Sequence, residues 1–336
     1  MFFFSFDLTY SLKLHMEEII DDCLSNRENS ARTFLIFNKA PTSILQALLK
    51  CDLFYNKITL FFLNAHHQNL DTPIIIISRI SSILLNIISN LPNEANNCVG
   101  FVYQLIPFIS DPSVFDLFNS ICSPDSELNA MQRSLIESNF SDYIYDELQK
   151  HFANYQKMNS DGCQLDESNT HDSNHQLQLT LADDNESFAE FKYLNINEFL
   201  ASLLRIIKLS LINSNLQASF RKYKLIEILH IITSCTSISD TSILNELWMC
   251  ISHFSLDSQF MHNMIIFLEP AIQIIIEPYL SVHAYHIYAI EFIANMMKLQ
   301  SNSLISSKLD AQIPQVLLRL IVQFPNSSNL MGSVFR

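Results

Sequence analysis

The sequence predicts an all-α protein, and three observations lead to that prediction. The chain has 336 residues but only three glycines, Gly100, Gly162 and Gly332. Glycine supplies the turns of β-hairpins and the phosphate-binding loops of nucleotide-binding α/β folds, so this composition disfavours both. Hydrophobic residues make up 49% of the chain, and many recur at steps of three and four, the period of an amphipathic helix. Polar segments rich in Asn and Ser, which cap helices, separate these runs.

The first half of the chain reads as a succession of short helices. Each predicted helix is an apolar run that follows a capping residue or a proline tolerated in the first turn, as at Asp71-Thr72-Pro73 and Asp111-Pro112. The predicted helices occupy residues 17–24, 31–37, 42–53, 73–90, 97–109, 113–121, 124–136 and 141–155.

Residues 156–187 differ in composition from the segments on both sides. They contain Asp161-Gly162, Asp166-Glu167, Asp172 and Asp183-Asp184, and few large apolar residues. A segment of this kind cannot bury enough apolar surface to offset the entropy of ordering. We expect an acidic disordered loop that acts as a solvated linker. Phosphorylation of its serines and threonines is the alternative role.

Helical periodicity resumes near Phe188. Apolar residues at 196, 200, 203, 207 and 211 form one stripe, and further helices are predicted at 220–235, 242–254 and 287–297. The last stripe, at residues 313, 316, 317, 320, 321 and 324, fits the helical template throughout and ends at Pro325. Successive amphipathic helices with short turns are typical of an α-solenoid, in which each helix pair buries its apolar face against its neighbours.

These features predict an armadillo/HEAT-like α-solenoid with one long acidic disordered loop. Its parts are an N-terminal helical half at 1–155, the loop at 156–187 and a C-terminal helical half at 188–336. The sequence shows no strict repeat, so degenerate repeats are expected rather than an array of fixed period.

Charge and cysteine content restrict the partners and the compartment. The formal net charge is −14, which argues against nucleic acid and anionic membranes and permits a basic protein partner. The seven cysteines are scattered and form no CxxC pair, so we expect reduced thiols in the cytoplasm, with the nucleus as an alternative. Residues 73–91 and 264–280 resemble membrane spans, but polar residues interrupt both, and we interpret them as core helices. The apolar start has no basic region before it and contains Asp7, so it is not interpreted as a signal peptide.

No catalytic motif or complete metal-ligand set is found, and neither a cofactor nor catalysis is predicted. Cys250 and His253 lie three residues apart with His262 beyond them, a partial zinc pattern that we interpret as a buried thiol and a capped histidine. His283 and His286, near Tyr279 and Tyr285, are interpreted as packing residues. The remaining candidates are interpreted as solvated polar surface: His66 and His67 in a turn, His171 and His175 in the loop, and Asp142, Asp146 and Glu147 on one helix face.

A basic cluster, Arg221-Lys222-Tyr223-Lys224, stands out in this acidic chain. It either binds an acidic segment of a partner or forms the exposed first turns of a helix whose apolar face is Leu225, Ile228, Leu229 and Ile232. The second interpretation is preferred.

Four segments carry a resemblance to a known family. Residues 1–8 read MFFFSFDL and lead to an acidic run at 16–22; residues 108–118 read FISDPSVFDLF; residues 195–205 read NINEFLASLLR; and residues 289–293 and 318–326 read AIEFI and LRLIVQFPN. In this order they resemble the SAPS-domain proteins, the regulatory subunits of the type 6 protein phosphatase. Asp116, Leu117, Glu291 and Pro325 match the family pattern, whereas Arg319 replaces an acid and Asn326 replaces a tryptophan.

The resemblance implies a non-catalytic regulatory subunit that binds a type 6-like, type 2A-related serine/threonine phosphatase catalytic subunit and directs its substrate choice or location. Further adaptor proteins are possible partners. The end of the last helix, at Arg319, Gln323, Phe324, Pro325 and Asn326, is the predicted contact surface, against the alternative that Phe324 is core and Pro325 only ends the helix. A generic armadillo or HEAT adaptor is the second hypothesis, and an enzyme with an unrecognised site is the third.

Overall fold

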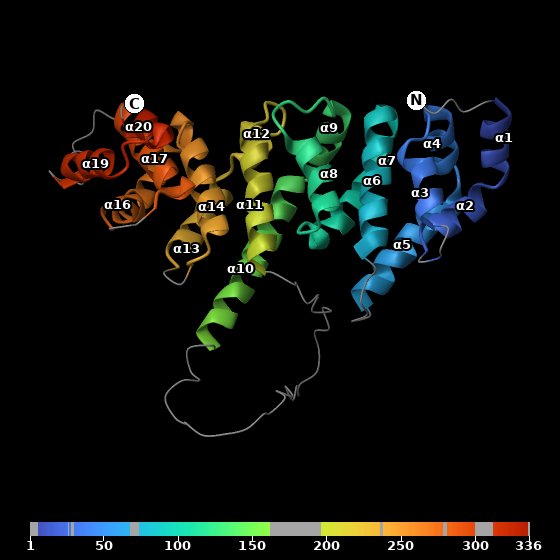
Figure 1. Ribbon diagram of the computed structural model, residues 1–336, viewed down its shortest axis with the longest axis horizontal. Helices are drawn as coiled ribbons and strands as arrows, with labels where there is room; N and C mark the ends of the chain where they lie inside the picture. Colours follow the sequence, from blue (N-terminus) through green and yellow to red (C-terminus); the bar gives the residue numbers. More distant parts are fainter. Residues whose placement is uncertain are drawn as a thin grey trace, which may run out of the picture. The chain divides into compact units, whose positions relative to one another are not determined.

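The structure, a computed structural model, describes residues 6–25, 27, 30–67, 74–161, 196–235, 238–277, 281–299 and 312–334. Every regular element in these ranges is a helix, and none of the described residues forms a strand (Figure 1). The prediction of an all-α protein is therefore confirmed. The predicted opening at residues 1–5, the cap at 71–73 and most of the predicted acidic loop lie outside the described residues.

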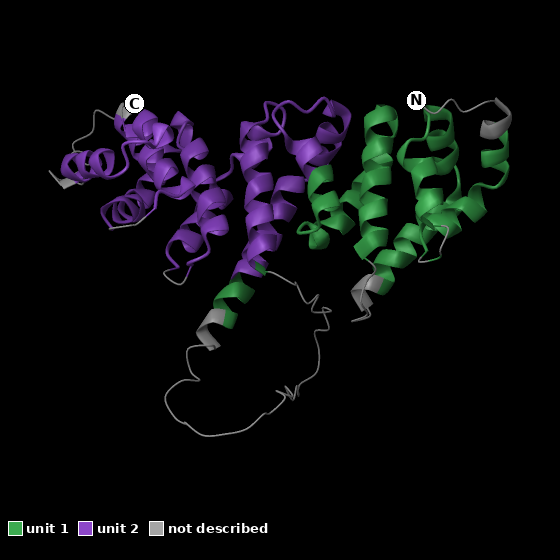
Figure 2. Ribbon diagram, viewed as in Figure 1, with its two compact units in different colours: residues 1–117, 153–196 green, residues 118–152, 197–336 purple. Residues whose placement is uncertain are grey.

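The chain forms two compact units (Figure 2). Unit 1 consists of Met1–Leu117 and Ala153–Ile196, and unit 2 consists of Phe118–Phe152 and Asn197–Arg336. This division differs from the one expected at 155 and 188, because residues 118–152 belong with the C-terminal helices.

The helices of unit 1 pack on helices close to them in the chain. α2 packs on α3 and α5, α3 packs on α6, and α6 packs on α7. The elements are α1 (Phe6–Leu14), α2 (Met16–Cys23), α3 (Ser30–Asn38), α4 (Thr42–Leu49), α5 (Asp52–His67), α6 (Ile74–Asn90), η1 (Pro92–Glu94), α7 (Ala95–Leu105) and η2 (Ile106–Phe108), and α8 (Pro112–Cys122) begins here.

Two expectations for unit 1 were wrong. The single helix predicted at 42–53 is divided into α4 and α5, and α5 continues through His66 and His67, which were expected in a polar turn. Buried Phe54, Ile58 and Phe62 explain this continuation, because a spacing of four keeps all three on the core side of one helix.

Unit 2 contains the end of α8 and the remaining helices. They are α9 (Asn129–Glu137), α10 (Phe140–Asp161), α11 (Ile196–Ile212), α12 (Gln217–Phe220), α13 (Tyr223–Thr233), α14 (Thr241–Phe254), η4 (Ser258–Phe260), α15 (Met261–Met264), η5 (Ile265–Phe267), α16 (Leu268–Ile276), α17 (Ala284–Leu299), α19 (Gln312–Gln323) and α20 (Ser328–Val334). The last turns of α10, from Ala153 onward, belong to unit 1.

Three boundaries differ from the predicted ones. α10 continues to Asp161, so the first residues of the predicted loop are helical. α9 begins at Asn129 rather than at Pro124. The helix predicted at 220–235 breaks at Arg221 and Lys222 into α12 and α13.

Asparagine takes over roles that glycine often has at helix ends. Asn139 adopts a positive φ of 59° between α9 and α10, a conformation common just after a helix. Buried Asn213 accepts hydrogen bonds at Oδ1 from the backbone N–H groups of Asn215 (2.9 Å) and Leu216 (3.1 Å). Its Nδ2 donates to the Ser123 carbonyl at 2.6 Å. A chain with three glycines can therefore still turn between helices.

Unit 2 contains a structural repeat that is hidden in the sequence. α11, α14, α17 and α20 begin at residues 196, 241, 284 and 328, so successive starts lie 45, 43 and 44 residues apart. The buried stripe of the first three helices recurs at intervals of 43: it comprises residues 200, 203, 204 and 207, then 243, 246, 247 and 250, then 286, 289, 290 and 293. A period of this length lies within the range of armadillo and HEAT repeats, ~40–47 residues.

Side-chain hydrogen bonds join successive helices of this series. The Asn245 Oδ1 on α14 accepts from the backbone N–H of Tyr285 on α17 at 2.9 Å. The Ser333 hydroxyl on α20 donates to Glu291 Oε1 on α17 at 3.2 Å. Hydrogen bonds therefore join α17 to both of its neighbours in the series, as in a repeat array.

Candidate interaction surfaces

The predicted C-terminal contact residues lie together at the end of α19. The helix ends at Gln323, two residues before Pro325, whose ring cannot continue it. Arg319, Gln323, Pro325 and Asn326 are exposed, and Phe324 is half-buried. Phe324 therefore belongs partly to the packed side of the helix, whereas the other four are accessible to a partner.

α19 is held against unit 2 by one face and leaves its opposite face open. It packs on α16 and α20, with Ile313 and Leu320 buried. The Arg319 Nη2 donates to the Ile276 carbonyl at the end of α16 at 3.3 Å. On the open face, Leu318 is 62% exposed and Val322 is 80% exposed. Sequence reasoning followed only the inward stripe of this helix and missed these two apolar side chains.

The basic cluster at 221–224 is neutralised within unit 2. Arg221 pairs with Asp257 at 3.3 Å, Lys222 pairs with Asp142 at 2.9 Å, and Lys224 pairs with Asp146 at 2.6 Å. These contacts favour the interpretation that the cluster is structural. They also correct the expectation for Asp142 and Asp146, which are paired with lysines rather than only solvated.

A second charged cluster, which the sequence did not reveal, joins α11 to α14. The buried Glu246 carboxylate lies 2.8 Å from Arg205 Nε and 3.0 Å from Lys208 Nζ. Because Glu246 occupies a position of the repeating core stripe, its charge needs these two partners. We interpret this cluster as a clamp between consecutive helices, since one buried carboxylate of α14 holds two cations of α11.

The partial zinc pattern does not assemble. Cys250 is fully buried, its thiol donates to the Leu204 carbonyl at 3.3 Å, and burial raises its pKa well above the usual range. Burial lowers the pKa of the nearby His253. Within the described ranges, no three His, Cys, Asp or Glu side chains are grouped so that they could hold a metal ion. Cys23, Cys98 and Cys122 are also free and buried, and burial raises the pKa of each to about 12.

His286 caps the start of α17. Its side chain is 2% exposed, and its Nδ1 accepts a hydrogen bond from the backbone N–H of His283 at 3.0 Å. Its ring stacks on Tyr285 with a centroid distance of 4.0 Å. An acceptor three residues into a helix that reaches back to the capping backbone N–H is the geometry of a capping box. His286 is therefore a packing residue that also caps α17. Tyr279 lies outside the described residues.

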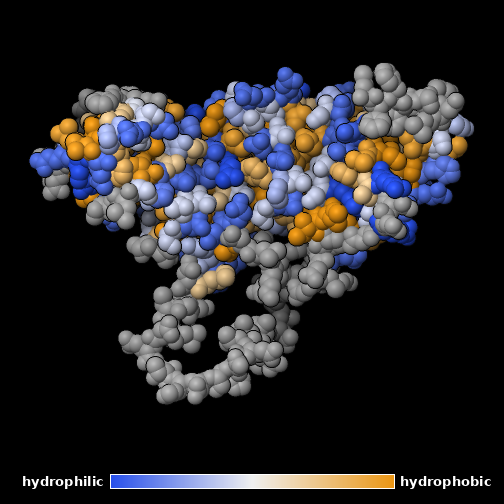
Figure 3. Space-filling model, viewed as in Figure 1, coloured by the Kyte–Doolittle hydropathy of each residue, from blue (hydrophilic) through white to orange (hydrophobic). Residues whose placement is uncertain are grey.

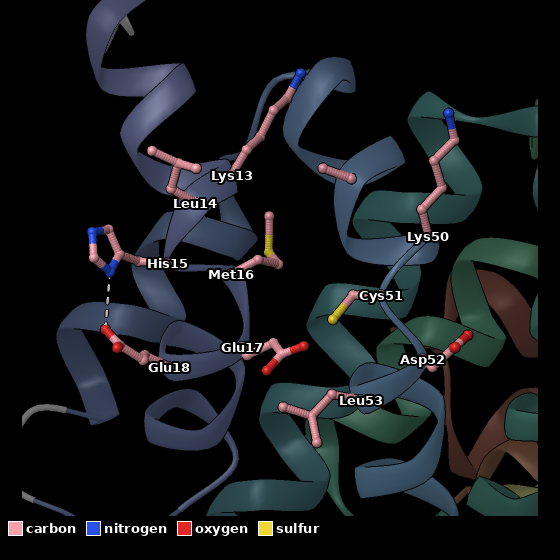
Figure 4. Close-up of a pocket in the computed structure, with 11 residues that line it drawn as sticks. Lys13, Leu14, His15, Met16, Glu17, Glu18, Lys50, Cys51, Asp52 and Leu53 are labelled. Atoms are coloured by element: carbon pink, nitrogen blue, oxygen red, sulfur yellow. Dashed lines mark hydrogen bonds and ion pairs between the residues drawn. The ribbon is translucent and has the colours of Figure 1, made fainter.

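A hollow of about 500 Å³ opens in unit 1 where the end of α1 and the start of α2 meet the junction of α4 and α5 (Figure 4). Lys13 and Lys50 line it together with Glu17, Glu18 and Asp52. His15 Nδ1 lies 3.1 Å from Glu18 Oε2. Because both signs of charge are mixed along its wall, the hollow does not select an anion or a cation.

One described stretch, Ser258–Ile276, has the length and apolar composition that a membrane-crossing helix needs. It overlaps the segment interpreted above as a core helix. Phe267, Leu268 and Ala271 within it are buried in unit 2, which is how a core helix packs. Figure 3 shows apolar and polar residues interspersed over the described part of one face of the molecule.

Comparison with known proteins yields a fold likeness and no family. No protein-family model and no curated protein matches the chain. One solved structure with a similar fold is the crystal structure of an engineered protein from the Northeast Structural Genomics Consortium, with a TM-score of 0.50 and 10% sequence identity. The likeness covers 98% of this chain and 69% of that chain. At this identity it concerns the fold alone and says nothing about function.

Proposed function

We propose that the chain is a non-catalytic scaffold of the armadillo/HEAT type that binds other proteins. The observation that carries this proposal is the 43-residue recurrence of the buried stripe in α11, α14 and α17. Stacked helical repeats of this kind present extended surfaces, and their usual function is to bind partner proteins. The predicted acidic segment would connect α10 to α11 in such a scaffold.

The partner proposed is the catalytic subunit of a type 6-like, type 2A-related serine/threonine phosphatase. The ordered resemblance to SAPS-domain regulatory subunits supports this choice. Two of the resembling segments contain a residue with a defined structural role in this chain. Asp111 caps α8, accepting at Oδ1 from the backbone N–H groups of Ser113 (2.9 Å) and Val114 (3.2 Å). Glu291 on α17 accepts from Ser333.

In this proposal the phosphatase subunit carries the metal chemistry, and this chain directs its substrate choice or location in the cytoplasm or nucleus. The proposed contact surface is the end of α19, with Arg319 and Gln323 on the helix and Pro325 and Asn326 in the following turn. The exposure of these four residues supports it.

Affinity purification of the tagged full chain, followed by mass spectrometry, tests the proposal. We expect a stoichiometric type 6-like catalytic subunit. We also expect Arg319→Glu to reduce its recovery, whereas Arg133→Glu, at an exposed arginine of α9, should not. Reproducible recovery of other proteins without a phosphatase would instead favour a generic armadillo or HEAT adaptor.

A further inference from the structure

α16 and α19 occupy the same place in successive repeats of unit 2. The buried face of α16 is formed by Leu268, Ala271, Ile272 and Ile275. Adding 45 to each number gives Ile313, Val316, Leu317 and Leu320, which form the inward face of α19 and are buried or half-buried. The two helices therefore present the same positions to the core, and their outward positions can be compared one by one.

The outward positions correspond in exposure but not in polarity. On α16 they are Glu269 and Gln273, and Glu277 follows directly after the helix ends at Ile276. All three are exposed, and the Gln273 Nε2 donates to Glu269 Oε1 at 3.4 Å. The same shift of 45 leads to Pro314, Leu318 and Val322 on α19, which are also exposed. One repeat therefore shows a polar stripe to solvent, and the next shows an apolar stripe at the same place.

Solvent alone does not account for this reversal, because the α16 stripe shows that polar side chains suit this position. Isolated apolar residues on a surface are common. Three exposed apolar residues spaced at four on one helix instead form the kind of ridge that an amphipathic helix covers. We propose that the outer stripe of α19, Pro314, Leu318 and Val322, docks an acidic amphipathic helix of a partner protein.

Charge complementarity favours an acidic partner helix. Residues 312–334, which form α19, the turn and α20, contain no Asp or Glu, although the whole chain carries a net charge of −14. Arg319 borders the stripe, is exposed, and uses one of its five N–H donors on the Ile276 carbonyl. A partner carboxylate beside the apolar anchors can therefore bind the remaining donors. Glu277 follows Ile276 in the chain but forms no ion pair with Arg319.

A second copy of this chain fits the stripe less well. A twofold contact between two α19 helices would bring the same patch of each copy together and place the two Arg319 side chains near each other. Like charges opposed in this way would repel.

The internal comparison supplies the variant that tests the proposal. Leu318→Gln gives α19 the residue that α16 carries at the same position, and Val322→Glu changes a side chain that is 80% exposed, so the fold should tolerate both. A photo-crosslinking amino acid at exposed Gln315, beside the stripe, should capture the partner when the full chain is expressed in cells. The matched control places the crosslinker at Gln273 on the α16 stripe.

We expect a crosslinked peptide from another protein, with apolar residues at helical spacing and neighbouring Asp or Glu, from position 315 but not from 273. A synthetic copy of that peptide should bind the double variant at least about tenfold more weakly than the unaltered chain. Arg319→Glu should also weaken binding of this peptide. A version of the peptide with its acidic residues changed to lysine should bind the Arg319→Glu variant more tightly than the original peptide does. Circular dichroism melting confirms that each variant is folded.

Four results would overturn the proposal: no crosslink from position 315, a crosslink to this chain itself, a captured peptide without carboxylates, or equal binding by the double variant. The proposal rests on the proposed scaffold function only in requiring a protein partner. The two can fail separately. Recovery of the phosphatase without a crosslink at 315 would support phosphatase binding and refute docking at the α19 stripe. A crosslinked acidic helix without any phosphatase would support docking at the stripe and refute phosphatase binding.

Discussion

His286 has a structural role that depends on its protonation state. Its Nδ1 can accept the backbone N–H of His283 only while that nitrogen is unprotonated. The pKa of this side chain is lowered from 6.5 to about 4, chiefly by burial; a backbone hydrogen bond with His283 raises it, and the charge of His283 lowers it. The neutral ring is therefore the form that completes the N-terminus of α17.

The stability of unit 2 should consequently fall in weak acid. The unfolded chain binds a proton at His286 near pH 6.5, whereas the folded chain does so only near pH 4. The stabilisation from His286 is thus complete above pH 6.5 and is lost as the pH falls towards 4, by roughly 2 to 3 kcal/mol. Burial also lowers the pKa of His253, which acts in the same direction. Urea unfolding followed between pH 4 and pH 7.5 measures this loss.

His286→Gln is the control for this pH dependence. Glutamine is a common acceptor at this position of a capping box and does not titrate. The variant should therefore lose less stability than the unaltered chain between pH 6.5 and 4. An unchanged pH slope in the variant would contradict the role assigned to His286.

Arg79 determines where the element α2 ends. This arginine of α6 is 6% exposed, and its Nη1 donates to the Cys23 carbonyl at 3.1 Å and to the Ser25 carbonyl at 3.0 Å. No described carboxylate pairs with it. The last carbonyls of a helix carry partial negative charge and have no partner within the helix, so a buried guanidinium can both satisfy them and be stabilised by them.

Arg79→Met should destabilise unit 1 by about 2 kcal/mol, because it leaves buried carbonyl groups without a donor. Arg79→Lys should restore only part of the loss, since a single ammonium does not reproduce the planar guanidinium. Arg133→Met, at an exposed arginine, should change stability by less than about 0.5 kcal/mol. Urea midpoints of the three variants give the comparison, and equal midpoints for Arg79→Met and the unaltered chain would refute the capping role.

The elements that the sequence predicts well are those whose apolar stripe is regular. α11, α14 and α19 begin and end close to the predicted residues for this reason. The break at Arg221 and Lys222 was not predictable, because apolar residues continue on both sides and the break depends on ion pairs with Asp142 and Asp257, distant in the chain. The same holds for Arg79, whose partners lie more than fifty residues away.

The candidate site could be predicted only in part. The helix periodicity placed Arg319 and Gln323 off the inward stripe of α19, and both are exposed. Leu318 and Val322 are recognised as a candidate docking stripe only by comparison with Gln273 on α16 and Glu277 just after it. Residue identity is not retained between these repeats, so only the pattern of burial reveals that correspondence.

At the scale of the whole molecule, a destabilising substitution in unit 2 should unfold only the helices near it. In the helix series of this unit, α14 packs on α17, and α20 packs on α17 and α19. Glu246 on α14 joins α11 through Arg205 and Lys208. The stability of such an array approximates a sum over repeats and their interfaces, so one repeat can open while distant ones remain folded.

Leu330→Asp tests this expectation in the full chain. Leu330 on α20 is 0% exposed, and a buried carboxylate there should cost about 3 kcal/mol or more. Hydrogen exchange followed by mass spectrometry should then show faster amide exchange in α17, α19 and α20 and unchanged exchange in α11. Asn329→Asp, on the exposed side of the same helix, should leave all four helices protected. Equal loss of protection in α11 and α20 would mean that unit 2 unfolds as one cooperative core, and the stacked-repeat description would then be wrong.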